Sequence, residues 1–230
     1  MTMYKKREWE SSFFKREIVD IAWEENNNLL HSSALVTTKL KAQDYKKIDH
    51  LLSLDFKYCE GEVHFLKDVK GHSDKLNFSI AKHSDFNEIS QIVSGLYEFS
   101  RFRAPWFTEN ERDSFYAEWI RKAILGSFDD CCIILKDSNN GPIKGFVTIK
   151  LNNSTSKIGL LGVNPENRGQ GIGTELLAAL EQYCISKLIK SISVATQISN
   201  LQAINLYIKN GYHVASTASW FYKGINNDSF

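Results

Sequence analysis

The sequence has little proline and little cysteine, with three and four residues among 230. The cysteines (Cys59, Cys131, Cys132 and Cys184) form no C-x-x-C pair and have no histidine at zinc-ligand spacing, which argues against a metal site. No stretch approaches the ~20 apolar residues of a membrane span. No apolar segment follows the basic start, as it would in a secretory signal. These absences predict a protein of the reducing cytoplasm.

An excess of charge of either sign is also missing. The 28 Lys and Arg residues face 27 Asp and Glu residues, which leaves a net charge of +1. This balance argues against a partner such as nucleic acid or a membrane bound through a basic patch. Hydrophobic residues make up 43% of the chain, enough for a core that needs no metal or disulfide.

The chain divides into two blocks, with a seam near residues 70–75. In the first block, an apolar run at 34–40 that is rich in Val and Thr predicts a strand. Apolar residues at helical spacing within 44–54 predict a helix, and the alternation at 56–66 predicts a second strand. The sequence therefore predicts a small N-terminal α/β domain over residues 1–75.

The second block, residues 76–230, predicts a larger domain of mixed α/β order. Asp85 and Glu88 have the spacing of a capping box, which places the start of a helix near residue 84. Further helices are expected at 110–125, 173–188 and 201–210. Strands are expected at 76–81, 131–135, 143–151, 157–163, 191–196 and 219–223.

The segment 158–174 carries a strong functional signal. An apolar strand ending at Val163 runs into the loop NPENRGQG, which opens directly into a helix. Backbone N–H groups of such a loop converge on one point, and the helix dipole adds positive potential there. Arg168 adds charge, and the glycines allow close approach. The loop is predicted to bind a phosphate or pyrophosphate, although it matches neither a Walker A loop nor G-x-G-x-x-G.

A second pattern follows the strand at 191–196. Asn200, Ala203 and Tyr207 stand at i, i+3 and i+7, which places them on one face of a helix. The pair of patterns, R-x-x-G-x-G at 168–173 and N-x-x-A-x-x-L-Y-x-x-x-G-Y at 200–212, resembles the GNAT superfamily of N-acetyltransferases.

The GNAT resemblance implies a mixed, mostly antiparallel sheet with flanking helices. It also implies that two neighbouring strands splay apart to admit the pantetheine arm of acetyl-CoA, the co-substrate, and that no metal is needed. The first pattern would hold the pyrophosphate. The residues it implies for acetyl-CoA are Leu161, Gly162, Val163, Arg168, Gly169, Gln170, Gly171, Ile172, Gly173, Thr174, Asn200 and Ala203.

Other segments resemble the dTDP-fucosamine acetyltransferases of bacterial surface-polysaccharide synthesis. They are WESSFF (9–14), EGEV (60–63), FSRFRAPW (99–106), FYAEWI (115–120), VATQ (194–197) and STASW (216–220). This resemblance implies acetyl transfer to the amine of a dTDP-linked amino-dideoxyhexose, and it leaves open whether the amine is on C3 or C4. A homodimer is expected.

Acetyl transfer to an amine needs an acid for the departing thiolate and a base for the amine. Tyr207 is the predicted acid, because a phenol with a pKa near ~10 is protonated at pH 7. Without the surrounding motif, a core tyrosine would be the simpler interpretation. Glu60 is the predicted base, acting directly or through a water, because a carboxylate in an apolar strand beside Gly61 could lie in a bulge. A solvent-facing edge residue is the alternative, and His64 and His83 are alternative bases.

The loop at 100–106 is predicted to contact the nucleotide sugar. Arg101 and Arg103 offer forked donors suited to a diphosphate, and Trp106 and Tyr116 could stack on a thymine or sugar face. The alternative is a surface loop beside core aromatic residues. Two other functions stay open: a protein or peptide N-acetyltransferase, and a catalytically silent acyl-CoA-binding module.

Overall fold

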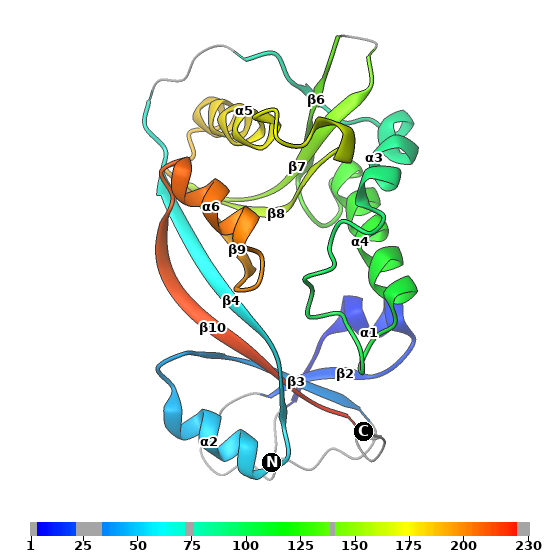
Figure 1. Ribbon diagram of the computed structural model, residues 1–230, viewed down its shortest axis with the longest axis vertical. Coiled ribbons are helices and arrows are strands. Elements are labelled where there is room, and N and C mark those ends of the chain that lie inside the picture. Colours follow the sequence, from blue (N-terminus) through cyan, green and yellow to red (C-terminus); the bar gives the residue numbers. More distant parts are fainter. Residues whose placement is uncertain (1–3, 22–33, 72–75, 139–140, 225–230) are drawn as a thin grey trace.

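The computed structural model describes residues 4–21, 34–71, 76–138 and 141–224 (Figure 1). Within these residues ten strands form one sheet. Their order across the sheet is β1 (Tyr4–Lys6), β2 (Ile18–Ile21), β3 (Leu35–Lys41), β10 (His213–Lys223), β4 (Lys57–Asp68), β9 (Ser191–Gln197), β8 (Thr155–Val163), β7 (Ile143–Asn152), β6 (Cys131–Lys136) and β5 (Ser79–Ile80). The pairs β2–β3 and β8–β9 are parallel and all other neighbours are antiparallel. The predicted mixed, mostly antiparallel sheet is confirmed.

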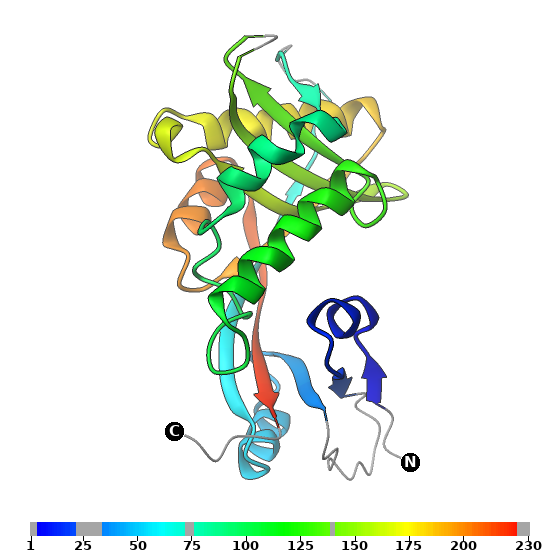
Figure 2. The same ribbon diagram turned by 90° about the vertical axis from the view of Figure 1, so that its right-hand side faces the viewer.

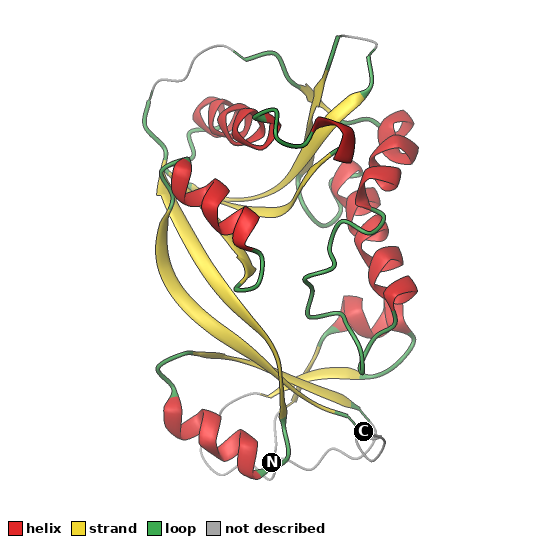
Figure 3. Ribbon diagram, in the orientation of Figure 1, coloured by secondary structure: helices red, strands yellow, loops and turns green. Residues whose placement is uncertain are grey.

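Helices cover both faces of the upper part of the sheet, as Figures 1 and 3 show. The helices are α1 (Glu8–Phe14), α2 (Tyr45–Ser53), α3 (Phe86–Val93), α4 (Glu109–Ile124), α5 (Ile172–Ser186) and α6 (Leu201–Lys209). Helices α3 and α4 lie on one side of β6–β8, and α5 and α6 lie on the other. The quarter-turn view in Figure 2 shows α3 and α4 lying across the strands of this face.

The sequence of strand β6 is an unbroken apolar run because the strand is covered on both faces. Ile133 and Leu135 pack in the cluster that includes Leu177 of α5, whereas Cys132 and Ile134 pack in the cluster of α3 and α4. A strand covered on both faces has no polar side, so its sequence is continuously hydrophobic rather than alternating. Strands β6 and β7, both expected from the sequence, pair antiparallel as a hairpin, and residues 139–140 between them lie outside the described residues.

The predicted capping box of Asp85 and Glu88 at the start of α3 is absent, so this prediction was wrong. The Asp85 carboxylate accepts from the Lys82 N–H at 2.8 Å and pairs with Lys136 at 2.8 Å, so it closes the short 3₁₀ turn before the helix. The Glu88 carboxylate accepts from the backbone N–H of Ile143 instead of reaching back to the cap. Glu88 therefore bonds to β7 in place of the local cap, whereas Asp85 bonds both to the turn before the helix and to Lys136 of β6.

The strands β1–β4 share the sheet with β10, the last strand of the described residues. Strand β10 lies between β3 and β4, and the long strands β4 and β10 run together down the molecule (Figure 1). The aromatic start of the chain forms α1, whose Trp9 stacks on Phe115 of α4 at 4.5 Å between ring centroids. The seam near residues 70–75 lies partly outside the described residues, and the domain division at residue 75 stays a prediction.

Candidate active site

The loop between β8 and α5 has the geometry of an anion cradle. Gly169 and Gly171 adopt left-handed φ values of 76° and 86°, a region that disfavours residues with a side chain. A Cβ atom at either position would meet no heavy atom within 4 Å, so the space in front of both is open. The backbone N–H groups of Ile172 and Gly173 start helix α5, and the first N–H groups of a helix have no intrahelical partner.

Strands β8 and β9 part beside this loop. Their parallel pairing covers Thr155↔Ser191 to Lys157↔Ser193 and goes no further. Beyond it the two strands diverge, as Figure 1 shows, although each continues for several residues. The separation leaves backbone groups of both strands free to contact a ligand, which is the arrangement that the sequence resemblance implied.

A cleft of about 710 Å³ lies at the loop, and we call it the glycine-loop cleft. Of the residues expected to hold acetyl-CoA, all but Gln170 line it. They are Leu161, Gly162, Val163, Arg168, Gly169, Gly171, Ile172, Gly173, Thr174, Asn200 and Ala203. The side chain of Gln170 turns back and donates to the carbonyl of Glu166 at 3.1 Å.

Asn200 caps helix α6 at the edge of the glycine-loop cleft. Its side-chain oxygen accepts from the Ala203 N–H at 3.1 Å, which caps α6. The residue also lines the glycine-loop cleft. The cap therefore fixes the start of α6, and with it the helix that carries Tyr207.

Tyr207 is almost fully buried, with 4% of its surface exposed. Its ring packs against Phe65 at 5.6 Å and Tyr212 at 5.5 Å between centroids. Burial raises the pKa of Tyr207 above its usual value, so the phenol keeps its proton at neutral pH. Its hydroxyl has no hydrogen-bond partner among the described residues, and the side chain lines a second cleft.

The second cleft has a volume of about 570 Å³, and we call it the arginine cleft. Its lining comes from α1, β2, β3, β4, α4, β8, β9, α6 and β10, and from loops that include Arg7, Tyr97 and Arg101. Tyr97, Leu161, Asn200 and Ala203 line both clefts, so the two meet where β8 and β9 part. A ligand in one cleft can therefore reach a ligand in the other through this gap.

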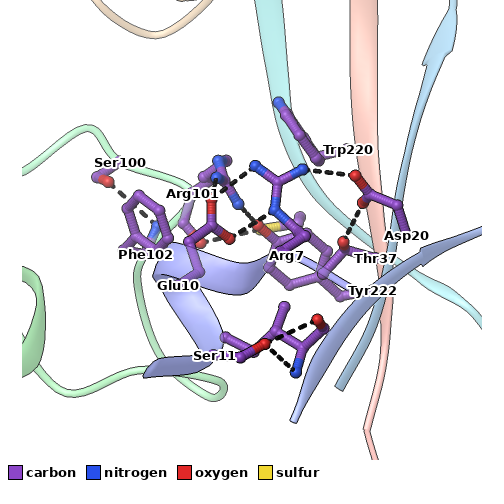
Figure 4. Close-up of polar contacts among 12 residues, drawn as sticks. Arg7, Glu10, Ser11, Asp20, Thr37, Ser100, Arg101, Phe102, Trp220 and Tyr222 are labelled. Carbon is purple, nitrogen blue, oxygen red and sulfur yellow. Dashed lines mark hydrogen bonds and ion pairs between the residues drawn. The ribbon is translucent and has the colours of Figure 1, made fainter. Parts of the chain in front are cut away.

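Four charged residues form a connected network at one end of the arginine cleft (Figure 4). Arg7 pairs with Glu10 and Asp20, each at 2.6 Å, and Arg101 pairs with Glu10 at 2.7 Å. The Trp220 ring lies under both guanidinium groups, 5.2 Å from Arg7 and 4.2 Å from Arg101. Burial opposes ionisation of Glu10, but the two arginines lower its pKa below the usual value. The network therefore lines the cleft with both donors and acceptors.

The four residues predicted to contact the nucleotide sugar fall into two pairs. Arg101 and Tyr116 line the arginine cleft. Arg103 and Trp106 line neither described cleft. Arg103 donates to the carbonyls of Cys59 and Ala104, and Trp106 is buried edge-on against Tyr222 at 5.0 Å. The two arginines therefore do not converge on one point, because the chain turns between them.

Glu60 lies outside both clefts. The pairing of β4 with β10 shifts at this point, because Glu60 faces Trp220 while Tyr58 faces Phe221. Cys59 is thus the extra residue of a β-bulge, as the sequence suggested, but the bulge does not direct Glu60 into a cleft. Its carboxylate accepts from the N–H of its own neighbour Gly61 at 3.0 Å.

Glu62, two residues further along β4, lines the arginine cleft instead. Its carboxylate accepts from His64 at 2.8 Å, from Lys39 at 3.1 Å and from the Trp220 indole at 2.6 Å. Burial would raise its pKa, but the His64 hydrogen bond, the Lys39 charge and the Trp220 N–H together lower the pKa of Glu62 to about 2. His64 and His83 line neither cleft.

Tyr97 is a site residue that the sequence analysis missed. It follows the end of α3, where Gly95 has a φ of 70°, and its hydroxyl donates to the Leu161 carbonyl at 3.2 Å. Its ring stacks on Tyr116 at 4.3 Å between centroids. Gly95 was the sequence signal that could have located it, because a glycine after an apolar helical face marks the end of a helix and the start of a loop. Tyr97 lies two residues into that loop.

Neither a metal site nor a membrane span appears in the part of the chain that the structure describes. No three His, Cys, Asp or Glu side chains there gather closely enough to hold a metal ion. None of the described helices is long and apolar enough to cross a bilayer.

Comparison with known proteins connects this geometry with a family. Over almost its whole length (94% of this chain, 95% of the relative), the chain is 34% identical to a dTDP-fucosamine acetyltransferase of Escherichia coli O6:H1. A GCN5-related N-acetyltransferase from Sphaerobacter thermophilus has a similar fold, with a TM-score of 0.58 at 16% identity, over 84% of this chain and 60% of that one. A tandem GNAT protein from the clavulanic acid biosynthesis pathway gives a TM-score of 0.64 at 13% identity, over 93% of this chain and 76% of that one.

The family model for the acetyltransferase (GNAT) family matches residues 95–212. These residues include the splayed strands β8 and β9, the glycine loop and helix α6. The chain belongs to the GNAT family of acetyltransferases.

Proposed function

We propose that this acetyltransferase moves the acetyl group of acetyl-CoA to the amine of a dTDP-linked amino-dideoxyhexose, for surface-polysaccharide synthesis. The observation that carries this proposal is the origin of the arginine cleft. Its network uses Arg7, Glu10 and Asp20, from an N-terminal segment outside the matched family region of 95–212. The similarity to the E. coli dTDP-fucosamine acetyltransferase covers 94% of this chain.

The glycine-loop cleft is the proposed site for acetyl-CoA, which supplies the acetyl group as a thioester. The open space at Gly169 and Gly171 leaves room for a pyrophosphate against the backbone. Arg168 lines the same cleft and adds positive charge. The backbone of Leu161–Val163 borders the gap, where an N–H group can polarise the thioester carbonyl.

Tyr207 is the acid in this proposal. The amine nitrogen forms a bond to the carbonyl carbon, the carbon–sulfur bond breaks, and the Tyr207 hydroxyl gives its proton to the departing sulfur. The raised pKa keeps that proton on the phenol until the thiolate forms. Because the hydroxyl is not engaged by any described residue, no protein bond must break before the transfer.

Water receives the amine proton in this proposal, and Glu62 holds the amine. A carboxylate with a pKa of about 2 is a weak proton acceptor at neutral pH. Its fixed negative charge can instead bind the ammonium form of the acceptor at the cleft. Glu60 is not carried into the proposal, because its carboxylate lies outside both clefts and bonds to its own backbone.

The arginine cleft is proposed to hold the nucleotide sugar. Arg101 and Arg7 present guanidinium groups over Trp220, suited to an anionic and polyhydroxylated ligand. Tyr116 and Tyr97 form a stacked aromatic pair in the cleft lining, which suits a planar base or a sugar face. The position of the amine on the ring, C3 or C4, stays open.

The test is an acceptor assay with pure protein, acetyl-CoA and four acceptors: dTDP-4-amino-4,6-dideoxygalactose, its 3-amino isomer, the free amino sugar, and a peptide with a free α-amino group. Thiol release and product mass are measured. Acetylation of a dTDP sugar with little transfer to the peptide would support the proposal. Transfer to the peptide alone would favour a protein N-acetyltransferase. Acetyl-CoA binding without turnover on any amine would favour a silent binding module.

The expected homodimer and the cytoplasmic location stay predictions. Sedimentation velocity of the pure protein would measure the oligomeric state directly.

A further inference from the structure

Strand β8 contains a bulge at the point where it leaves β9. Val147 of β7 faces Leu161, and Ile149 faces Ile158, so Gly159 and Leu160 together oppose the single residue Thr148. A bulged residue loses its place in the hydrogen-bond ladder. The Leu160 N–H instead donates to the side-chain hydroxyl of Thr148 at 2.8 Å.

The Thr148 hydroxyl is itself bonded to a buried carboxylate. Asp129, in the segment before β6, is 3% exposed, and its Oδ2 accepts from the Thr148 hydroxyl at 2.6 Å. The same oxygen accepts from the Trp119 indole of α4 at 2.7 Å. Burial raises the pKa of Asp129 although both hydrogen bonds favour the ionised form. A chain of hydrogen bonds thus runs from α4 through Asp129 and Thr148 to the Leu160 N–H.

Gly159 is the residue that lets the carboxylate approach. A Cβ atom there would overlap the Asp129 carboxylate and would lie 2.7 Å from the Thr148 hydroxyl. Contacts this short with a buried pair cannot be relieved by moving the end of a flexible side chain. The bulge, the glycine and the carboxylate therefore form one unit.

The unit lies next to the gap between the two clefts. Lys157 is the last residue of β8 paired with β9, and the bulge begins two residues later. A bulge bends its strand and increases its twist, which directs Leu161–Val163 away from β9. Gly159, Leu160 and Leu161 line the arginine cleft, and Leu161, Gly162 and Val163 line the glycine-loop cleft. Asp129 itself lines neither cleft.

We propose that Asp129 is a positioning residue for acetyl transfer: through Thr148 it holds the β8 bulge, and the bulge aims the backbone N–H groups of β8 at the thioester carbonyl. This inference uses the GNAT activity of the family and is independent of which amine is acetylated. The competing interpretation is that Asp129 only ties α4 to the sheet. The two differ in what Thr148 should do, because Thr148 connects Asp129 to β8 and not to α4.

The experiment compares Asp129→Leu, Thr148→Val and Asp129→Asn with the matched control Asp130→Leu. Asp130 is the adjacent carboxylate and accepts from the Leu151 N–H at 2.6 Å, away from the bulge. Thr148→Val keeps the shape and removes the hydroxyl, and Asp129→Asn keeps an oxygen in place to accept hydrogen bonds. Amide hydrogen exchange of Leu160 is followed by NMR without ligand. Infrared difference spectra with ¹³C-labelled acetyl-CoA then report the carbonyl stretch of the bound thioester.

Asp129→Leu and Thr148→Val should speed exchange at Leu160 about tenfold, the loss of roughly one buried hydrogen bond. Both should move the bound carbonyl stretch back toward its value in solution, and lower kcat by about 100-fold where an acceptor is turned over. Asp130→Leu should leave both the Leu160 exchange rate and the bound carbonyl stretch unchanged. Asp129→Asn should stay close to wild type in both measurements. The proposal is overturned if Thr148→Val leaves the carbonyl stretch unchanged, or if Asp130→Leu shifts it equally. Failure of every sugar acceptor would overturn the proposed function and leave the exchange and infrared results to decide this inference.

Discussion

The glycine-loop cleft and the arginine cleft meet at one gap, yet they are built in opposite ways. The first is centred on one stretch, from the end of β8 to the start of α5. Residues 95–99 after α3 and residues at the start of α6 complete its lining. The second is made of side chains that come from nine elements between Arg7 and Trp220. One cleft depends on local conformation, and the other depends on how the whole chain folds.

The difference between a loop-based cleft and a side-chain cleft indicates which ligand group each one can recognise. Backbone N–H groups in a glycine loop bind any phosphate that reaches them, so they suit a group common to all acyl-CoA substrates. Side chains such as Arg101, Glu62 and Tyr116 form a fixed pattern of charge and ring faces, which can select among acceptors. Changes in the first cleft should therefore affect acetyl-CoA, and changes in the second should affect the amine.

The largest expected effect comes from Gly171→Val. A β-branched residue is strained at the φ of 86° that Gly171 adopts, and its side chain would occupy the open space in front of the loop. We expect the Kd for acetyl-CoA to rise by roughly 100-fold or more, measured by calorimetry on protein shown to be folded by circular dichroism. Gln170→Ala is the control, because the Gln170 side chain bonds to Glu166 and lies outside the cleft. If Gly171→Val bound acetyl-CoA as tightly as wild type, the glycine loop would not be the pyrophosphate site.

The next effect is expected for Tyr207→Phe, which keeps the ring and removes the proton donor. General-acid help is worth roughly 10²- to 10⁴-fold, and a thiolate with a pKa near ~8.5 leaves without much assistance. We therefore expect kcat to fall by about 100-fold, with both KM values changed by a small factor. Tyr212→Phe is the matched control, because its buried hydroxyl has no partner among the described residues and it lines neither cleft. Wild-type kcat for Tyr207→Phe would leave water as the proton source.

The same division between local and distant structure explains what could be predicted from the sequence. Most helices and strands of the second block lie close to their expected ranges, because each has a strong period or an unbroken apolar run. Two strands differ: β10 begins at His213, six residues before the expected 219, and the strand expected at 76–81 is only Ser79–Ile80. The glycine loop was predictable since its residues are contiguous. Helix α1 was missed because it is held by stacking of Trp9 on Phe115, a contact between residues about a hundred positions apart.

The side-chain site was predictable only in part. Arg101 and Arg103 are separated by one residue, and no local pattern says that one reaches Glu10 while the other reaches the Cys59 carbonyl. Glu60 and Glu62 are alike in sequence context. What distinguishes them is a set of distant partners, Lys39 and Trp220 for Glu62, and these become neighbours only when β10 inserts between β3 and β4.

A third prediction separates the two arginines. Arg101→Lys keeps the charge beside Glu10 but loses the forked donor set and its bond to Tyr222. We expect the KM for the acceptor to rise by about tenfold, the size of one charge-assisted hydrogen bond, with the KM for acetyl-CoA nearly unchanged. Arg103→Lys should change each KM less than twofold, because Arg103 lines neither cleft. If both variants weakened the acceptor equally, the arginine cleft would not be the acceptor site.

The smallest effect concerns acid stability and compares Glu62→Gln with Glu60→Gln. The pKa of Glu62 is lowered from 4.5 to about 2 in the folded protein, so its ionisation stabilises the fold above pH ~4.5, and this contribution is lost as the pH falls toward 2. The shift corresponds to at most about 3 kcal/mol. We expect Glu62→Gln to melt roughly 5 °C below wild type at pH 7, and the difference should shrink steadily as the pH is lowered to 3. Glu60→Gln is the control on the same strand, because the carboxylate contact seen for Glu60 is a bond from its own neighbour Gly61 and not from Lys39 or Trp220. Scanning calorimetry at pH 7, 5, 4 and 3 measures the gap, and a constant difference across that range would show that the charge of Glu62 does not stabilise the arginine cleft.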